Sequence, residues 1–281
     1  MIAAADATRA AVPELEQVAF PSLDAAMTGG APTSLVGLLA RPQGSGPFPA
    51  VVLLHGCGGL YTRNGVLTGR HGDWSRALSA AGFVTLLVDS FTPRGLTQIC
   101  TMKERPIRAG RERTLDAYGA LRYLQGLPYV RAEGVGLLGW SHGGVTTLFS
   151  VDPATPMRPK VLPEVDFHAA VAFYPGCRPA NQLGWSANIP LLMLLGGKDD
   201  WCPAHHCVEV AERARASGSP VEVVVYPEAH HDVDAPDLAL RQRSGLAFAE
   251  GGTAMVGTDP AARADALERV PAFFRQHLGR G

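Results

Sequence analysis

Short apolar runs, separated by polar and turn-rich segments, recur along the whole chain. Most of them show little polar alternation, which is typical of strands buried on both faces of a parallel sheet. The first two runs, at residues 15–20 and 34–40, flank the turn-rich segment 28–32 and predict a lead-in hairpin. The pattern predicts further strands at residues 50–54, 83–88, 167–174, 190–195 and 221–226, and one that begins at residue 135.

Helical periodicity fills the intervals between these runs. It predicts helices over residues 71–81, 111–125, 145–151 and 203–217, and a terminal helical region over residues 259–277. Asp259 and Pro260 provide a capping side chain and a proline at the first helical position. Pro271 is expected to kink or split that helix. Strands that alternate with helices throughout predict a single α/β domain over residues 1–281, built on a mostly parallel, doubly wound sheet of about eight strands.

Two segments stand outside this alternation. Residues 1–12 are rich in alanine and lack the charged start and continuous apolar stretch of a signal peptide. They are expected to be a frayed terminus, and a remnant left by cleavage at a small residue fits equally well. Residues 152–163 are rich in proline and are expected to form a lid or a surface loop.

The strand that begins at residue 135 runs directly into the motif Gly139-Trp140-Ser141-His142-Gly143. A strand, then G-x-S-x-G, then a helix is the context of a nucleophile elbow, in which a cramped turn exposes the serine hydroxyl. Glycines two residues to either side remove the side chains that would clash there. We therefore interpret Ser141 as a nucleophile rather than as an exposed serine in a glycine-rich loop.

The other strand ends supply partners for a nucleophilic serine. The strand at 50–54 ends in His55-Gly56-Cys57-Gly58-Gly59, where small residues allow backbone N–H groups to face a cleft as an oxyanion hole requires. Cys57 is the expected donor, with Gly58 second and the backbone N–H of His142 as the partner donor. A carboxylate, Asp199 or Asp200, and an imidazole, His230 or His231, follow two later strands. In a doubly wound sheet these ends meet, and the order Ser, Asp, His is the one this architecture uses.

At this point the chain resembles the dienelactone hydrolase family of α/β-hydrolases over nearly its whole length. The resemblance rests on His55-Gly56-Cys57-Gly58-Gly59, Phe91-Thr92-Pro93-Arg94-Gly95, Gly139-Trp140-Ser141-His142-Gly143, Tyr174-Pro175-Gly176, Gly196-Gly197-Lys198-Asp199-Asp200 and Tyr226-Pro227-Glu228-Ala229-His230-His231. It implies Asp199 as the acid, because the family's aspartate directly follows the glycines and has a proline four residues further on. It implies His231 as the base, because the family's histidine stands two residues after the small residue that follows the last strand.

One position departs from the family pattern. The namesake enzymes carry cysteine in the elbow, where this chain carries Ser141. The lactone substrate of the namesake is therefore not carried over. The resemblance implies a serine carboxylesterase that acts on esters of small or medium size, with no cofactor. A peptidase or amidase with the same triad, and a catalytically silent binding protein, remain the alternatives.

Three further side chains, those of Arg94, Trp140 and His230, are candidates for contacts with the substrate. Arg94 either orients a substrate carboxylate or carbonyl or bonds loop carbonyls as a structural arginine. Trp140 is expected to pack below the site, and His142 to pack locally or bond behind it. His230 is expected to pack beside His231 or to line the rim.

The chain contains five cysteines, more than a cytosolic enzyme needs and too few for a disulfide scaffold. Cys57 and Cys100 follow strands expected to be neighbours, and so do Cys177 and Cys207, which predicts two disulfides and leaves Cys202 free. Alternatively, all five are buried thiols. The cluster Cys202, His205, His206 and Cys207 superficially resembles a set of metal ligands, but it lies across a helix start without a second ligand cluster, so no metal is expected.

Charge narrows the range of partners. The chain has 25 basic and 26 acidic residues and a net charge of −1, which favours neither nucleic acid nor an anionic membrane as a partner. No apolar run is long enough to span a bilayer. A basic cluster interrupted by glutamates is interpreted as a solvated surface rather than a phosphate or carboxylate patch; it comprises Lys103, Arg105, Arg108, Arg111 and Arg113. The expected partner is a small-molecule ester, the chain a monomer or homodimer, and a periplasmic or secreted location is favoured over the cytoplasm.

Overall fold

The structure is a computed structural model that describes residues 14–156, 158–159, 165–182 and 184–279. The predicted frayed terminus, residues 1–12, lies outside the described residues. So does part of the predicted lid or loop at 152–163, namely residues 157 and 160–163.

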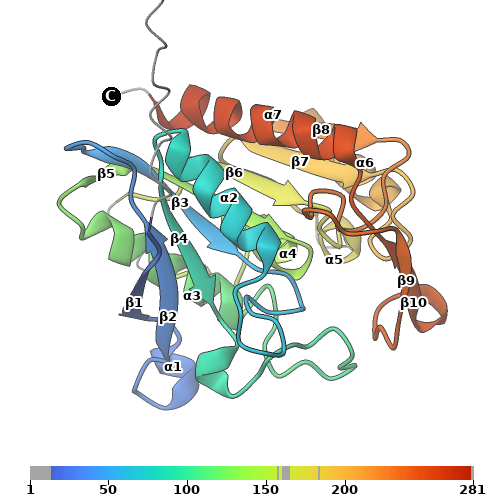
Figure 1. Ribbon diagram of the computed structural model, residues 1–281, viewed down its shortest axis with the longest axis horizontal. Coiled ribbons are helices and arrows are strands. Elements are labelled where there is room, and N and C mark those ends of the chain that lie inside the picture. Colours follow the sequence, from blue (N-terminus) through green and yellow to red (C-terminus); the bar gives the residue numbers. More distant parts are fainter. Residues whose placement is uncertain (1–13, 157, 160–164, 183, 280–281) are drawn as a thin grey trace, which may run out of the picture.

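A central sheet of eight strands forms the body of the molecule (Figure 1). The strand order is β1-β2-β4-β3-β5-β6-β7-β8. β1 and β2 pair antiparallel with each other, and β2 also pairs antiparallel with β4, whereas every other neighbouring pair is parallel. The strands are β1 (Glu16–Pro21), β2 (Ser34–Ala40), β3 (Phe48–Leu54), β4 (Val84–Asp89), β5 (Val130–Trp140), β6 (Ala169–Phe173), β7 (Leu191–Gly196) and β8 (Val221–Tyr226). The predicted fold class, a mostly parallel, doubly wound sheet of about eight strands, is confirmed.

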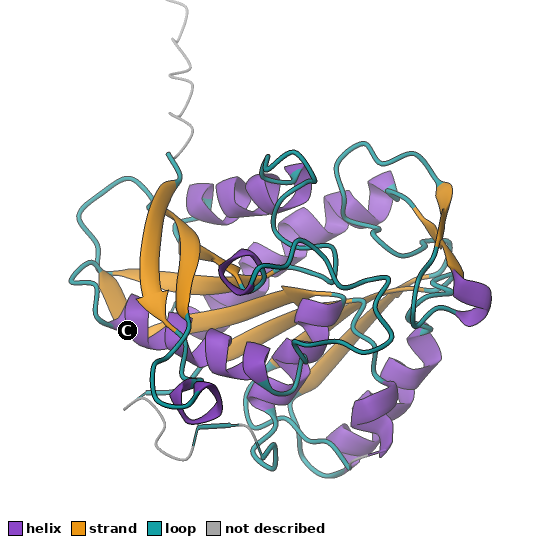
Figure 2. Ribbon diagram, turned by 90° about the horizontal axis from the view of Figure 1, so that it is seen from below, coloured by secondary structure: helices purple, strands orange, loops and turns teal. Residues whose placement is uncertain are grey.

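Helices cover both faces of this sheet (Figure 2). α2 (Gly69–Ala80) and α7 (Pro260–Leu278) lie on one face, and α3 (Glu112–Gln125), α4 (His142–Val151) and α6 (Ala204–Ala216) lie on the other. The shorter elements are α1 (Ala25–Thr28), η1 (Thr92–Arg94), α5 (Arg178–Gln182) and η2 (Glu250–Gly252).

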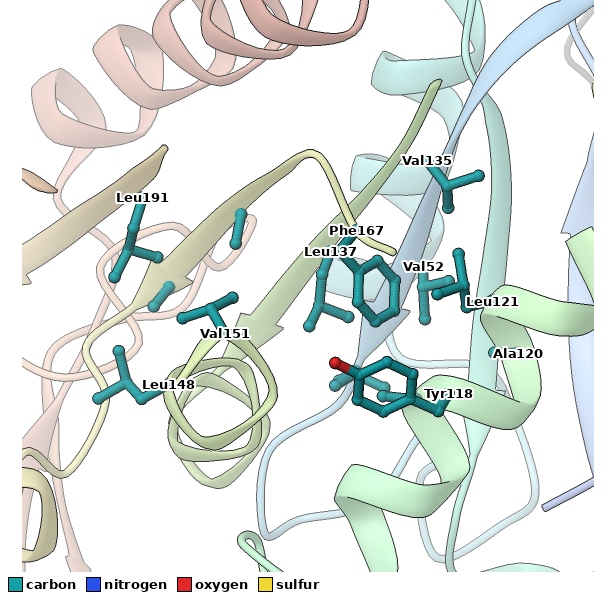
Figure 3. Close-up of a cluster of buried hydrophobic side chains, with 14 of the residues drawn as sticks. Val52, Tyr118, Ala120, Leu121, Val135, Leu137, Leu148, Val151, Phe167 and Leu191 are labelled. Carbon is teal, nitrogen blue, oxygen red and sulfur yellow. The ribbon is translucent and has the colours of Figure 1, made fainter. Parts of the chain in front are cut away.

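Successive residues of β3 belong to two separate cores. Val51 and Leu53 pack with the residues of α2 and α7, whereas Val52 and Leu54 pack with those of α3 and α4. Figure 3 shows the second core, where Val52 and Leu137 from the sheet face Tyr118 and Leu121 of α3. Burial on both faces explains why the sequences of β3, β6 and β7 are apolar throughout rather than at alternate positions.

Two details of the C-terminal third differ from the prediction. Pro271 does not split the last helix, because α7 runs from Pro260 to Leu278 as one helix and buries Pro271 against the sheet. Residues 221–226 do not form the last strand: β9 (Arg241–Ser244) and β10 (Thr253–Val256) follow as an antiparallel hairpin that extends from the edge of the molecule (Figure 1). The sequence of β9, RQRS, has no apolar pattern that could have predicted a strand.

No helix among the described residues combines the length and the apolar character that crossing a bilayer requires.

The contact between α3 and β1 depends on a glycine. A Cβ at Gly119 would lie 2.4 Å from the carbonyl oxygen of Pro21, a backbone atom that cannot rotate away. We predict that Gly119→Ala lowers the free energy of unfolding by about 1–3 kcal/mol, the usual effect of overpacking. The midpoint of a urea titration measures it.

Gly72 of α2 is the matched control, because it is also helical and a Cβ there would first meet the flexible end of Arg76, at 3.3 Å. Gly72→Ala should be neutral or stabilising by up to about 1 kcal/mol, since alanine is the better helix former. Equal losses in the two variants would contradict the assigned contact.

Candidate active site

Three polar side chains meet beyond the carboxyl ends of the parallel strands. Ser141 directly follows β5, Asp199 follows β7, and His231 follows β8. The Ser141 hydroxyl lies 3.1 Å from Nε2 of His231, whose Nδ1 lies 2.7 Å from Oδ2 of Asp199. The three groups therefore form a continuous hydrogen-bonded chain, and their role in catalysis is taken up as a proposal below.

The backbone at Ser141 is strained. Its φ of 50° and ψ of −112° lie in a region that residues with a side chain rarely adopt. The flanking glycines make the turn fit: a Cβ at Gly139 would lie 2.2 Å from the Gly143 oxygen, and one at Gly143 would lie 2.1 Å from the Leu54 oxygen. Glycine is thus required at both positions of the motif, because backbone atoms lie too close on either side of the serine to leave room for a side chain.

Asp199 is held in place by its other oxygen. Its Oδ1 accepts hydrogen bonds from the backbone N–H groups of Trp201, at 2.9 Å, and Cys202, at 2.8 Å, which leaves Oδ2 for His231. Asp200 instead accepts from the N–H of Met255 in the hairpin and does not reach His231 through any described bond. The structure thus brings together Asp199 and His231, the pair that the resemblance implies, rather than Asp200 or His230.

The imidazole of His231 is buried and lies against a carboxylate. Burial acts to lower the pKa of His231, but the Asp199 carboxylate, with help from Asp232, raises it above its usual value of 6.5. The ring of Trp201 packs against it with centroids 4.7 Å apart. Its position and its proton affinity are therefore both set by neighbours that the fold supplies.

Of the three predicted oxyanion donors, two line the cavity that contains Ser141 and one does not. Cys57 and His142 line the same cavity as Ser141, whereas Gly58 does not line it. A Cβ at Gly56 would lie 3.5 Å from that of Ser141, so the loop after β3 passes directly beside the nucleophile turn. The backbone N–H groups of Cys57 and His142 stay the predicted donors.

A buried arginine fixes the state of His142. Nη1 of Arg113 lies 3.0 Å from Nδ1 of His142, and Arg113 is fully buried. Burial lowers the pKa of Arg113 to about 9, so the guanidinium remains charged at neutral pH and donates this bond. His142 then accepts at Nδ1 and carries its proton on Nε2. This bond to Arg113 agrees with the expectation that the side chain of His142 makes a hydrogen bond behind the site.

The remaining candidates do not line the cavity that contains Ser141. Arg94 bonds both oxygens of Asp116, at 2.8 and 2.9 Å, and Asp24, at 2.9 Å, so it is a structural arginine rather than a substrate ligand. Trp140 is fully buried, donates to Asp234 and does not line the cavity, so it packs below the site as expected and is not a substrate contact. His230 does not line the cavity.

Asp234 organises a buried layer that the sequence did not point to. It has no exposed surface, and its Oδ2 accepts from the indole N–H groups of Trp74 and Trp140, each at 2.7 Å. The Tyr174 hydroxyl donates to its Oδ1, and the Tyr174 ring packs against His231 with centroids 4.5 Å apart. Arg70 bonds the adjacent Asp232 at 2.6 Å. No short motif marks these residues, because their partners are far apart in sequence.

The cysteines pair as two disulfides, Cys57–Cys100 and Cys177–Cys207, and Cys202 is free. Cys207 is therefore not available as a thiolate ligand, and Nε2 of His206 faces Arg178 at 3.4 Å. The sulfur of Cys202 lies in the cavity next to Ser141. Burial and the Asp199 carboxylate raise the pKa of Cys202 well above its usual value, so its thiol is neutral.

A cavity of about 1080 Å³ opens above Ser141. The interpretation of the basic cluster as a solvated surface is wrong for Arg113, which is buried. Lys103, Arg108 and Arg111 are exposed, and together with the half-buried Arg105 they line this cavity. The helical pattern showed where α3 begins, but not that the segment before it folds over the active site.

Comparisons with known proteins agree with this architecture. A putative dienelactone hydrolase from Klebsiella pneumoniae superposes with a TM-score of 0.64 at 20% identity, covering 93% of this chain and all of that one (100%). A Thermogutta terrifontis esterase 2, phosphorylated by paraoxon, gives a TM-score of 0.66 at 15% identity over 94% and 95% of the two chains. The fold is that of the α/β-hydrolases.

The family follows from the sequence match. The model of the dienelactone hydrolase family matches residues 35–278, and the chain belongs to this family. A probable 2-oxo-3-(5-oxofuran-2-ylidene)propanoate lactonase from Bradyrhizobium is 26% identical, over 77% of this chain and 84% of the relative. Acyl-coenzyme A thioesterase 1 of Rattus norvegicus is 25% identical over 86% of this chain, which spans 62% of the thioesterase's length. The chain is thus a member of a family of hydrolases.

The charge on Asp199 has a measurable effect on His231. We predict that the imidazole titrates above pH 6.5 in the wild type and that Asp199→Asn moves its pKa downward, because the substitution leaves burial to act without the opposing carboxylate. Histidine NMR resonances followed against pH measure both values. An unchanged pKa in the variant would show that Asp199 does not set it.

Proposed function

We propose that this protein is a serine hydrolase that cleaves carboxylic esters of small or medium size through an acyl-enzyme intermediate. The observation that carries the proposal is the unbroken chain from the Ser141 hydroxyl through His231 to Asp199, at 3.1 and 2.7 Å. It supports the activity because a serine hydroxyl needs a positioned base to become a nucleophile. The relatives described above are a lactonase, a thioesterase and an esterase, and all three names describe cleavage of a bond to an acyl carbon.

In the first half of the reaction, Oγ of Ser141 attacks the acyl carbon while Nε2 of His231 takes the hydroxyl proton. Asp199 accepts from Nδ1–H of His231, which fixes the tautomer and stabilises the imidazolium. The negative charge that develops on the acyl oxygen is received by backbone N–H groups, for which those of Cys57 and His142 are the proposed donors. The tetrahedral intermediate then collapses, and the imidazolium donates its proton to the leaving oxygen.

In the second half, a water molecule attacks the acyl-enzyme. His231 takes a proton from the water and returns it to Oγ of Ser141, which releases the carboxylic acid. The raised pKa of His231 suits it to hold a proton within each half, between taking it from the nucleophile and donating it to the departing oxygen. The neutral thiol of Cys202 is no competitor for the attack, because no described bond joins it to the imidazole and its pKa is raised.

If Ser141 is the nucleophile, removing its hydroxyl should cause a large loss of esterase activity. Ser141→Ala should reduce the turnover of p-nitrophenyl butyrate by about 10⁶-fold, the loss found when a triad serine is removed. Ser217→Ala, at an exposed position after α6, is the matched control and should retain wild-type activity.

Circular dichroism checks that both variants fold, and the same assay with the matched anilide separates an esterase from an amidase. A folded Ser141→Ala variant that hydrolyses the ester at the wild-type rate would overturn the assignment.

We infer further that the protein works in an oxidising compartment, because disulfides persist there and are rare in the cytosol. The two bridges close loops of 43 and 30 residues in sequence. We predict that reduction adds the mass of two hydrogens per bridge to the intact protein and lowers the free energy of unfolding by about 2–4 kcal/mol for each bridge. Mass spectrometry with and without reductant, and urea titration of both forms, measure the two effects; an unchanged mass would remove the bridges.

A further inference from the structure

The cavity above Ser141 carries an excess of positive charge. Among its described lining residues the single carboxylate is that of Glu104. The cations that line it are Lys103, Arg105, Arg108, Arg111 and Arg178. Four of the five come from the segment that precedes α3, so one stretch of chain places them over the site.

Most of these cations have no ion-pair partner among the described residues. Arg111 pairs with Glu112 at 3.5 Å. Lys103, Arg105 and Arg108 form no ion pair with any residue in the described ranges of the chain. Arg94, by contrast, is neutralised by two carboxylates. The charge over the cavity is therefore not balanced within the described structure.

Arg105 is the most firmly held of the unpaired cations. Its guanidinium stacks over the ring of Phe248 with 4.3 Å from Cζ to the ring centroid, so the segment before α3 meets the segment after β9 across the cavity. Its Nε is buried and has no hydrogen-bond partner among the described residues. A buried donor without an acceptor is destabilising, and a ligand oxygen that accepted from it would offset that cost.

Arg105 is also near the reacting groups. Its charge acts on the thiol of Cys202, whose pKa it helps to lower against the effect of burial, and on His142, whose pKa it lowers. Cys202 and His142 are both neighbours of Ser141. Arg105 and Ser141 line the same cavity, so a substrate held at Ser141 shares that space with this guanidinium.

Apolar side chains form another part of the lining, at Val145, Phe149, Pro156 and Trp201. Phe149 packs against the basic segment, since a Cβ at Gly110 would lie 2.7 Å from the ring of Phe149. An apolar wall beside unpaired cations fits a ligand that has a hydrocarbon part and an anionic group.

We propose that Arg105, supported by Lys103 and Arg108, forms an anion subsite that binds a carboxylate or phosphate group of the ester or thioester cleaved at Ser141. This inference rests on the proposed hydrolase function and adds the class of substrate to it. Arg105 is a specificity residue in this scheme: it contacts the anionic group, and Phe248 holds its guanidinium plane in position.

Two matched substrate pairs test the subsite and locate the anion. p-Nitrophenyl octanoate and the p-nitrophenyl monoester of octanedioic acid differ only by a carboxylate at the far end of the acyl chain. Octanoylpantetheine and octanoylphosphopantetheine differ only by a phosphate on the leaving group. We expect the wild type to prefer the anionic member of one pair by about tenfold or more in kcat/KM, the size of a charge-assisted hydrogen bond. The pair that shows the preference identifies the side on which the anion binds.

Arg105→Met removes the charge and keeps an apolar stem against Phe248, and it should abolish that preference. Arg63→Met is the control, because Arg63 is exposed and does not line the cavity, and it should keep both the activity and the preference of the wild type. Added salt should weaken the wild-type preference through screening. Equal kcat/KM within both pairs, or a preference that survives Arg105→Met, would overturn the subsite.

Binding to Ser141→Ala separates this inference from the hydrolase function. Calorimetry on that variant should show tighter binding of the same anionic member than of its neutral partner, whether or not the wild type turns the substrate over. Anion-dependent binding without turnover in the wild type would refute the proposed function and support the subsite. Turnover of the neutral esters without any preference for the anions would support the function and refute the subsite.

Discussion

The structure depends on a backbone turn at Ser141 that no residue with a side chain adopts readily. The strain is tolerated because β5 ends between β3 and β6, so that the turn is pinned on both sides: Ser141 donates its N–H to Phe173 at 2.9 Å, and Gly143 lies directly against Leu54. Rigid packing around a strained residue holds it in place even though relaxation would lower its local energy. The hydroxyl is consequently presented at the centre of the sheet, where the later strand ends can reach it.

A second constraint is the layer of buried charge beneath the site. Asp234 is buried together with Arg70, and it satisfies the polar atoms of Trp74, Trp140 and Tyr174. A buried carboxylate is costly unless its oxygens are bonded, and here each oxygen has a donor. The loop that carries His231 also carries Asp234, so the same bonds that satisfy the carboxylate hold the histidine loop against the sheet.

The basic groups of the chain fall into two kinds. Arg94 bonds two carboxylates and ties η1 to α3 and to the loop after β1, whereas Arg105 stands over the cavity without a carboxylate partner. The disulfide from Cys57 to Cys100 joins the loop beside the nucleophile to the segment that leads to Arg105. The same covalent link thus connects the predicted oxyanion donor to the proposed anion subsite, and a reduced protein would hold the two less rigidly.

The sequence by itself determined the parallel sheet, its helices and the order of the chemical groups along it. Apolar runs buried on both faces and a glycine-flanked serine are local signals, readable without knowledge of the fold. Tertiary structure decided the rest. Asp234 and Arg113 acquire their roles from partners far away in sequence, and the hairpin β9–β10 has no apolar period to reveal it. The sequence predicted a solvated surface for the basic segment because charge patterning is a local signal. The cavity that this segment lines is formed together with Phe149 and Phe248, and only folding brings these two residues beside the segment.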